Sequence, residues 1–232
     1  MENNGQKQIA SAIIIAGFLI AGAVLLKGNM DTSNPAKGGA RKLNPSTAKT
    51  IGLNVKDFAS CLASGKFKDK VQADIDDGSK IGVNGTPSSF ILNNGKVVDV
   101  IKGAQPLEQV RSQLTQAKNK TKSLGINLKP VSLDEHITGN PNAKIVVVEY
   151  SDLECPFCKM FQNTMQQIIG ENPDVAWVYR HYPIPQLHPK AFHESEASEC
   201  AWEQGGNDAF WKYIDHIHQI TPSNNGLDVK EL

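Results

Sequence analysis

The stretch AKIVVVEYSDLECPFCKMF, residues 143–161, joins an apolar run to two cysteines, Cys155 and Cys158, in a C-x-x-C pattern. The apolar, β-branched run within residues 143–150 is typical of a strand that is buried on both faces. Apolar residues then recur at helical spacing up to Ile169, and Pro156 suits a first helical turn because it lacks only an N–H that is free there anyway. The cysteine pair is therefore predicted at a strand-to-helix junction.

This position favours thiol chemistry. The thiolate is the attacking form of cysteine, and the free N–H groups and dipole of a helix N-terminus lower the pKa of a thiol. We expect Cys155 to be exposed and to attack, and Cys158, one turn further, to resolve the mixed disulfide. A structural disulfide or half of a zinc site are the alternatives that the pair alone leaves open.

Zinc is disfavoured by the rest of the chain. A structural zinc site needs four ligands, but the sequence holds no second C-x-x-C pair, and its six histidines show no partner spacing. We therefore expect no metal site, and we expect the histidines to be surface or packing residues.

Outside the motif, the chain alternates short β runs with helices, as in an α/β fold. The residues 94–95, Asn-Gly, predict a tight hairpin because they readily adopt positive φ angles. A polar stretch, 119–143, is expected to be a linker. The other predicted elements are helices at 55–65, 66–78, 106–117, 191–205 and around 210–217, a hairpin over 88–101 and a strand at 174–183.

Composition limits the function classes. The 232 residues include 24 basic and 24 acidic side chains, so the net charge is zero and no nucleic-acid surface is indicated. Four cysteines are too few for a small disulfide-built scaffold. With 40% hydrophobic residues, the chain can pack one good-sized domain or two small ones.

The N-terminus predicts a membrane anchor. Residues 9–26 carry no charge, and eighteen residues approach the ~20 that span a bilayer as a helix. A cleaved signal peptide, the alternative, usually has a shorter apolar core of ~7–15 residues. We expect an anchor at 1–27 and a flexible linker at 28–43. Basic residues after the run would put the body inside, but the thiol chemistry belongs outside, and we expect an extracytoplasmic body.

The motifs resemble a known family. The sequence VVVEYSDLECPFC resembles the active-site half of a DsbA-like thiol–disulfide oxidoreductase of the thioredoxin superfamily. KVQADIDDGSKIGVNGTPSSFILNNGKVV, residues 70–98, resembles the half that carries the family's cis-proline. SEASECAWEQGG and DFASCLASGKF resemble its helical subdomain. The resemblance covers 44–118 and 130–232, and it implies an α/β thioredoxin-like fold with a helical subdomain.

The resemblance also implies roles. Cys155 would attack and Cys158 would be the buried resolver. Pro87, expected in the cis form, would shape the substrate groove, and Thr86 would offer backbone hydrogen bonds to a bound peptide; an ordinary turn proline is the alternative. Glu149 would be a buried acid that exchanges protons with Cys158, the alternative being an exposed strand residue.

Cys61 and Cys200 both fall in the helical subdomain of the resemblance. It implies a structural disulfide between them, with two buried free thiols as the alternative.

The order of the segments departs from the family. Here the cis-proline half, 44–118, precedes the cysteine half, 144–232, and the chain ends inside the helical subdomain. We interpret this as a circular permutation, in which 119–143 can reach up to ~80 Å when extended. An engineered permutant, a remnant of two tandem domains and a sequence-assembly error are left open.

The combined prediction is a membrane-anchored enzyme that introduces, reduces or isomerises disulfides in exported proteins with thiols. It would need a redox partner for recycling and no cofactor. The alternative is a non-catalytic thioredoxin-like binding or chaperone module whose cysteines are purely structural.

Overall fold

The computed structural model describes residues 46–232. The predicted anchor at 1–27 and the predicted linker at 28–43 lie outside the described residues. Within 46–232, no helix is both long and apolar enough to cross a membrane.

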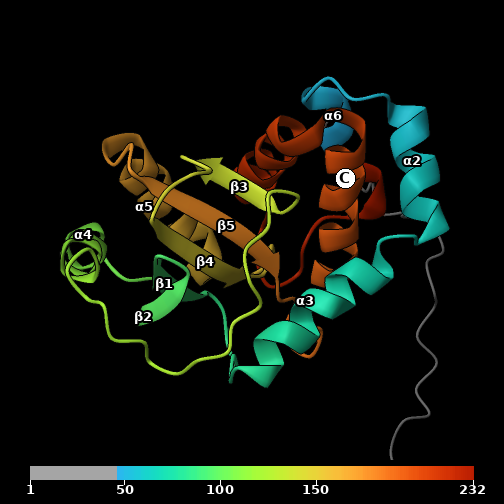
Figure 1. Ribbon diagram of the computed structural model, residues 1–232. Helices are drawn as coiled ribbons and strands as arrows, with labels where there is room; N and C mark the ends of the chain where they lie inside the picture. Colours follow the sequence, from blue (N-terminus) through green and yellow to red (C-terminus); the bar gives the residue numbers. More distant parts are fainter. Residues whose placement is uncertain (1–45) are drawn as a thin grey trace, which may run out of the picture. The chain divides into compact units, whose positions relative to one another are not determined.

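A five-stranded mixed sheet forms the centre of this body, in the order β2-β1-β4-β5-β3 (Figure 1). The central strand β4 runs parallel to its neighbour β5, and the other neighbouring strands pair antiparallel. The parallel pair is buried on both faces, as the apolar runs predict. The strands are β1 (Ser88–Asn93), β2 (Lys96–Lys102), β3 (His136–Gly139), β4 (Ile145–Ser151) and β5 (Val175–His181).

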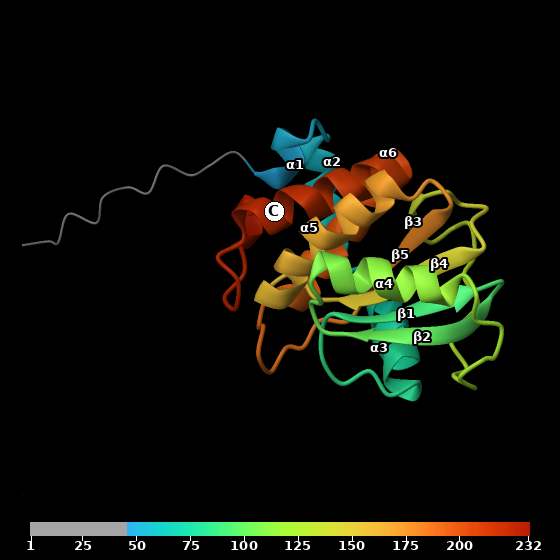
Figure 2. The same ribbon diagram turned by 90° about the vertical axis from the view of Figure 1, so that its left-hand side faces the viewer.

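Different segments cover the two faces of the sheet. Helices α4 (Leu107–Ala117) and α5 (Pro156–Glu171) pack on one face, where both lie in Figure 2. The other face is covered in part by apolar residues of 126–131, within the stretch that was expected to be a linker. The sheet is therefore a layer with apolar packing on both sides.

The remaining helices form a helical subdomain whose core also includes Tyr179 of β5, and α3 packs against both α6 and β5. Its apolar core joins Phe58 and Leu62 of α2 to Phe210, Tyr213 and Ile214 of α6, and Figure 1 shows these two helices side by side. Helix α6 is broken where Gly205 and Gly206 leave helical geometry, as the two predicted helical stretches require. The helices are α1 (Thr47–Thr50), α2 (Val55–Ser64), α3 (Lys68–Lys80), α6 (Ala191–Ile220) and the short 3-10 turn η1 (Val229–Glu231).

The two ends of the described chain meet in this subdomain. The backbone N–H of Ala48 donates to the carbonyl of Leu232 at 2.8 Å, and the Thr47 hydroxyl donates to the carbonyl of Glu231 at 2.9 Å. Elements from the beginning and the end of the body therefore share one core.

The stretch 119–143 is more than a linker, since it contains the edge strand β3. The buried guanidinium of Arg180 holds it: Arg180 donates to the carbonyl of Lys129 at 2.9 Å and to the Glu135 carboxylate at 3.0 and 3.1 Å. A third contact, 2.9 Å to Asp77, ties the same guanidinium to α3. The four residues of β3 show no alternation of apolar and polar side chains. Pairing with β5, rather than a local sequence pattern, therefore creates this strand.

Candidate active site

Two segments far apart in the sequence bring the proposed site together. β1 pairs with β4 so that Ser88 lies opposite Tyr150, one residue before β4 ends. This register carries the Thr86–Pro87 peptide bond, which is cis as expected, to the start of α5. The thiol of Cys155 lies 3.5 Å from the carbonyl oxygen of Thr86.

Cys155 caps the N-terminus of α5 and Cys158 lies one turn inside; both are free cysteines. The expectation that Cys155 is exposed is wrong, since only 4% of its surface is accessible. The Thr86–Pro87 loop packs against its sulfur and covers it. The neighbouring Phe157 is 56% exposed, so the surface beside the motif remains open.

The two thiols differ sharply in acidity. The pKa of Cys155 falls to about 6, chiefly because the Cys158 side chain hydrogen-bonds to its sulfur, and backbone N–H groups at the helix start assist. Burial raises the pKa of Cys158 well above its ordinary value, and the adjacent Cys155 and Glu149 raise it further. Cys155 is therefore the thiol that ionises first.

Glu149 is 1% exposed within β4, so the alternative of an exposed strand residue is wrong. Burial raises the pKa of its carboxyl to about 7, although a hydrogen bond from the Trp177 indole at 3.0 Å favours the ionised form. A carboxyl with such a pKa can take up and release a proton near neutral pH.

A second acid, Asp152, lies between the strand and the cysteines and was not singled out from the sequence. It is fully buried, and its carboxylate accepts a hydrogen bond at 2.8 Å from Nδ1 of His188, itself 5% exposed. Asp152 lies inside the motif, but His188 is 36 residues away, so only the fold reveals the pair.

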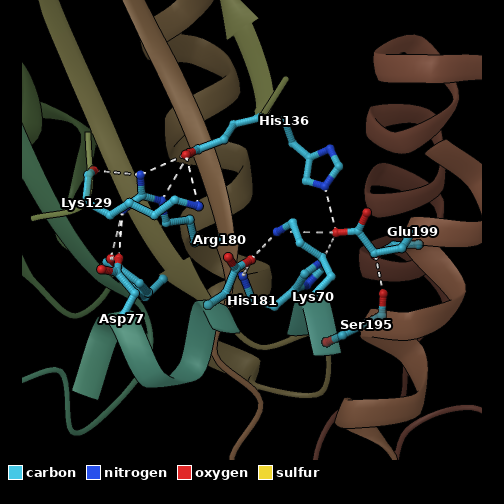
Figure 3. A network of polar contacts seen from close by, with 12 residues as sticks. Lys70, Asp77, Lys129, His136, Arg180, His181, Ser195 and Glu199 are labelled. Carbon is cyan, nitrogen blue, oxygen red and sulfur yellow. Dashed lines mark hydrogen bonds and ion pairs between the residues drawn. The ribbon is translucent and has the colours of Figure 1, made fainter. Parts of the chain in front are cut away.

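Three further buried side chains, from β3, β5 and α6, converge where the sheet meets α6 (Figure 3). Nε2 of His136 and Nε2 of His181 lie 2.8 and 2.9 Å from the same oxygen of Glu199. Among the described residues this is the one cluster with the residue types and spacing of a metal site. The expectation that the histidines are surface or packing residues did not include this contact, which is made in space.

The geometry of this cluster favours a hydrogen-bond network over a metal. Both N···O distances are those of hydrogen bonds, and the Lys70 ammonium already lies 3.7 Å from the same Glu199 oxygen. Burial alone would raise the pKa of Glu199, but the hydrogen bonds from His136 and His181 hold it well below its ordinary value. An ionised Glu199 thus accepts from both imidazoles and faces one ammonium.

The remaining cysteines, Cys61 and Cys200, form a disulfide between α2 and α6 with Cα atoms 5.9 Å apart. This confirms the pairing that the resemblance implied.

Comparisons with known proteins match separate parts of this chain. Residues 36–115 match the model of the DSBA-like thioredoxin domain, and residues 132–230 match the model named Thioredoxin. The crystal structure of Pseudomonas aeruginosa DsbA2 aligns with 36% identity over 45% of this chain and 60% of that chain, with a TM-score of 0.40.

Curated relatives carry a different name. The Na(+)/H(+) antiporter NhaA 3 of Salinispora tropica is 36% identical over 100 residues, which are 41% of this chain and 15% of that protein. NhaA 1 of Mycolicibacterium gilvum is 37% identical over 107 residues, 45% of this chain and 16% of that protein. The chain thus spans less than a fifth of the length of these relatives.

Proposed function

We propose that this chain, which carries a DsbA-like thioredoxin domain, is a thiol–disulfide oxidoreductase that works through Cys155 and Cys158. The observation that carries the proposal is the unequal pair at the start of α5. A sulfur with a pKa of about 6 lies beside a loop that can receive a peptide, and a thiol that stays protonated lies buried behind it.

The proposed cycle starts from the Cys155–Cys158 disulfide. A substrate thiolate attacks the sulfur of Cys155, the disulfide breaks, and Cys158 leaves with the electron pair and takes up a proton. A second substrate thiolate then attacks the mixed disulfide and expels Cys155 as a thiolate. The substrate has lost two electrons and two protons and gained a disulfide, and the two cysteines are reduced. The low pKa of Cys155 makes it a good leaving group, which favours oxidation of the substrate.

Thr86 and Pro87 are the proposed substrate contacts. They line a cleft of about 570 Å³ between the loop before β1 and the end of β2. An extended peptide that lies in this cleft would bring its cysteine to the sulfur of Cys155, 3.5 Å from the Thr86 carbonyl. Main-chain hydrogen bonds would hold such a peptide without strict sequence preference.

Glu149 is the proposed proton carrier for Cys158. When Cys158 leaves the disulfide it gains a negative charge in a fully buried place, and this charge must be neutralised. Glu149 is close enough for its charge to raise the pKa of Cys158, and its own pKa of about 7 lets it donate the proton.

The test uses a trapping variant, Cys158→Ser. The substrate is a protein whose thiols have been converted into activated disulfides with a thiol reagent. The Cys155 thiolate should attack these disulfides, and the mixed disulfides should accumulate because no second thiol releases them. Cys155→Ser is the matched control and should trap nothing. Absence of trapped species in Cys158→Ser would contradict the proposal and favour a non-catalytic module with structural cysteines.

We also propose a cellular location and partners for the enzyme. Residues 9–26 would anchor the chain in a membrane with its body on the extracytoplasmic side, where exported proteins would be substrates and a separate redox protein would recycle the cysteines. Disulfides form and persist in oxidising compartments, which supports this placement. Labelling of Cys155 in intact cells by a membrane-impermeant thiol reagent tests it, and labelling only after lysis would contradict it.

We also infer that the order of segments is a circular permutation. The hydrogen bonds from Ala48 to Leu232 and from Thr47 to Glu231 support it, since they bring together the two ends of the described chain, which an unpermuted order would join. The two family models, matched in separate parts of the chain, are consistent with it. A rearranged chain that starts at residue 119 and joins residue 232 to residue 46 should fold with the same disulfide and the same thiol acidity.

A further inference from the structure

The pair formed by Asp152 and His188 lies directly behind the cysteines. Asp152 belongs to the turn between β4 and α5, and His188 belongs to the loop between β5 and α6. Both are buried. A buried carboxylate needs a charged or hydrogen-bonded partner, because the protein interior solvates it far less well than water does.

Asp152 has such partners on every side. One carboxylate oxygen accepts from Nδ1 of His188 and from the backbone N–H of Ile184, both at 2.8 Å. The other oxygen accepts from the backbone N–H of Glu154 at 2.9 Å. The side chain therefore ties the loop after β5 to the turn that carries the cysteines.

The backbone of Asp152 contacts both cysteines. Its carbonyl accepts from the N–H of Cys155 at 3.1 Å, and its own N–H points at the sulfur of Cys158 at 3.5 Å. A shift of Asp152 would consequently move the helix start and the donor to Cys158 together.

The charges of the pair also reach Cys155. Burial lowers the pKa of His188, but the hydrogen bond and charge of Asp152 outweigh it, and Cys155 adds to the net rise. The other charged groups that face this region are Glu154 on the turn and Lys190 and Glu194 at the start of α6. When His188 is protonated, its positive charge offsets the negative charge of the Asp152 carboxylate beside the cysteines.

We propose that His188 is a positioning residue of the redox site: paired with Asp152, it fixes the turn 152–155 and cancels the carboxylate charge that would otherwise oppose the Cys155 thiolate. This inference rests on the proposed function, because it concerns the same two cysteines. It adds a residue from a different loop to the groups that set the acidity of Cys155.

The first test is His188→Gln in the reduced protein. Glutamine can still donate to Asp152 but carries no charge. We expect the pKa of Cys155, followed by thiolate absorbance near 240 nm, to rise by about one unit, which is a tenfold loss of thiolate at pH values below it. The matched control is His193→Gln, a partly exposed histidine of α6 whose partner is Glu196, and it should leave the titration unchanged. An unchanged pKa in His188→Gln, or an equal shift in both variants, would overturn the proposal.

The double variant Asp152→Asn/His188→Gln separates charge from packing. If charge compensation is what matters, removing both charges should return the pKa of Cys155 toward its original value, whereas loss of packing would leave it raised or raise it further. The second outcome would overturn the charge argument.

A final measurement does not depend on how well these variants fold. Coupling between two sites is reciprocal, so the Cys155 thiolate must raise the pKa of His188. We expect the imidazole pKa, measured by NMR, to be lower in Cys155→Ser than in the reduced wild type, and equal values would overturn the proposal. The trapping experiment with Cys158→Ser keeps the two ideas separate, because it tests exchange at Cys155 in a protein that retains His188.

Discussion

The Cys61–Cys200 disulfide offers a quantitative test of how the helical subdomain is held together. The bridge closes a loop of 139 residues between α2 and α6. In the loop-entropy model, a loop of this length removes about 17 cal/mol/K from the unfolded chain, which corresponds to about 5 kcal/mol at 25 °C. For a body of this size, a loss of 5 kcal/mol lowers the melting temperature by about 10–20 °C.

The perturbation is reduction of the Cys61–Cys200 bridge, and Cys155 and Cys158 must not contribute to the measured difference. In a Cys155→Ala/Cys158→Ala background, only the Cys61–Cys200 bridge responds to reductant. We expect urea unfolding of the oxidised and reduced forms to differ by about 5 kcal/mol at the same slope. Both cysteines belong to the buried cluster, and reduction removes no atoms from it, so we expect lost packing to contribute little to this difference.

The control is the same background with Cys61→Ala and Cys200→Ala, in which reductant should have no effect. A difference below about 2 kcal/mol between the oxidised and reduced forms would refute the loop-closure argument. It would mean that the reduced, unfolded chain already holds the two helices near each other.

Three other predictions concern buried carboxyl groups. Burial raises the pKa of Glu194 to about 7, above the unfolded value of about 4.5. Its contribution to stability is therefore present below pH 4.5 and lost as the pH rises to 7. Glu194→Gln should remove up to about 3 kcal/mol of the fall in unfolding free energy between pH 5 and pH 8, and equal falls in the variant and the wild type would contradict this. Glu149→Gln removes the proposed proton donor to Cys158 and should slow exchange by about tenfold or more in stopped-flow measurements, so an unchanged rate would disprove the role. Glu199→Ala leaves the Nε2 donors of His136 and His181 without their acceptor, whereas Lys70 keeps Asp74 at 2.6 Å. The variant should cost about 3–5 kcal/mol in urea unfolding, against less for Glu199→Gln, and a loss under about 1 kcal/mol would show that the imidazoles find other partners.

The elements around the motif were predictable because their signals are local. The apolar run, the helix start at Pro156 and the second strand each depend on neighbouring residues, and they appear as β4, α5 and β5. The Asn-Gly turn also holds, with φ angles of 48° at Asn94 and 75° at Gly95. Glycine often follows the last residue of a helix, but α5 continues through Gly170 to Glu171.

The parts of the site that sequence reasoning missed depend on partners far along the chain. His136 and Glu199 are 63 residues apart, and β3, β5 and α6 bring their side chains together. The covering of Cys155 likewise depends on the loop at Thr86, which precedes it by 69 residues. No periodicity within a short window carries such information, whereas the family resemblance supplied the Thr86–Pro87 contact because it describes a whole fold.

The order of the segments changes what the disulfide does. If residue 232 were joined to residue 46, the same bridge would close a loop of roughly 50 residues and contribute about 1 kcal/mol less. In the present order the helical subdomain is built from two ends of the body that are otherwise connected only through the sheet, and the contacts of Arg180 with Lys129 and Glu135 hold the connecting stretch against that sheet. Under the proposed permutation, the bridge would therefore stabilise the present order more than the unpermuted one.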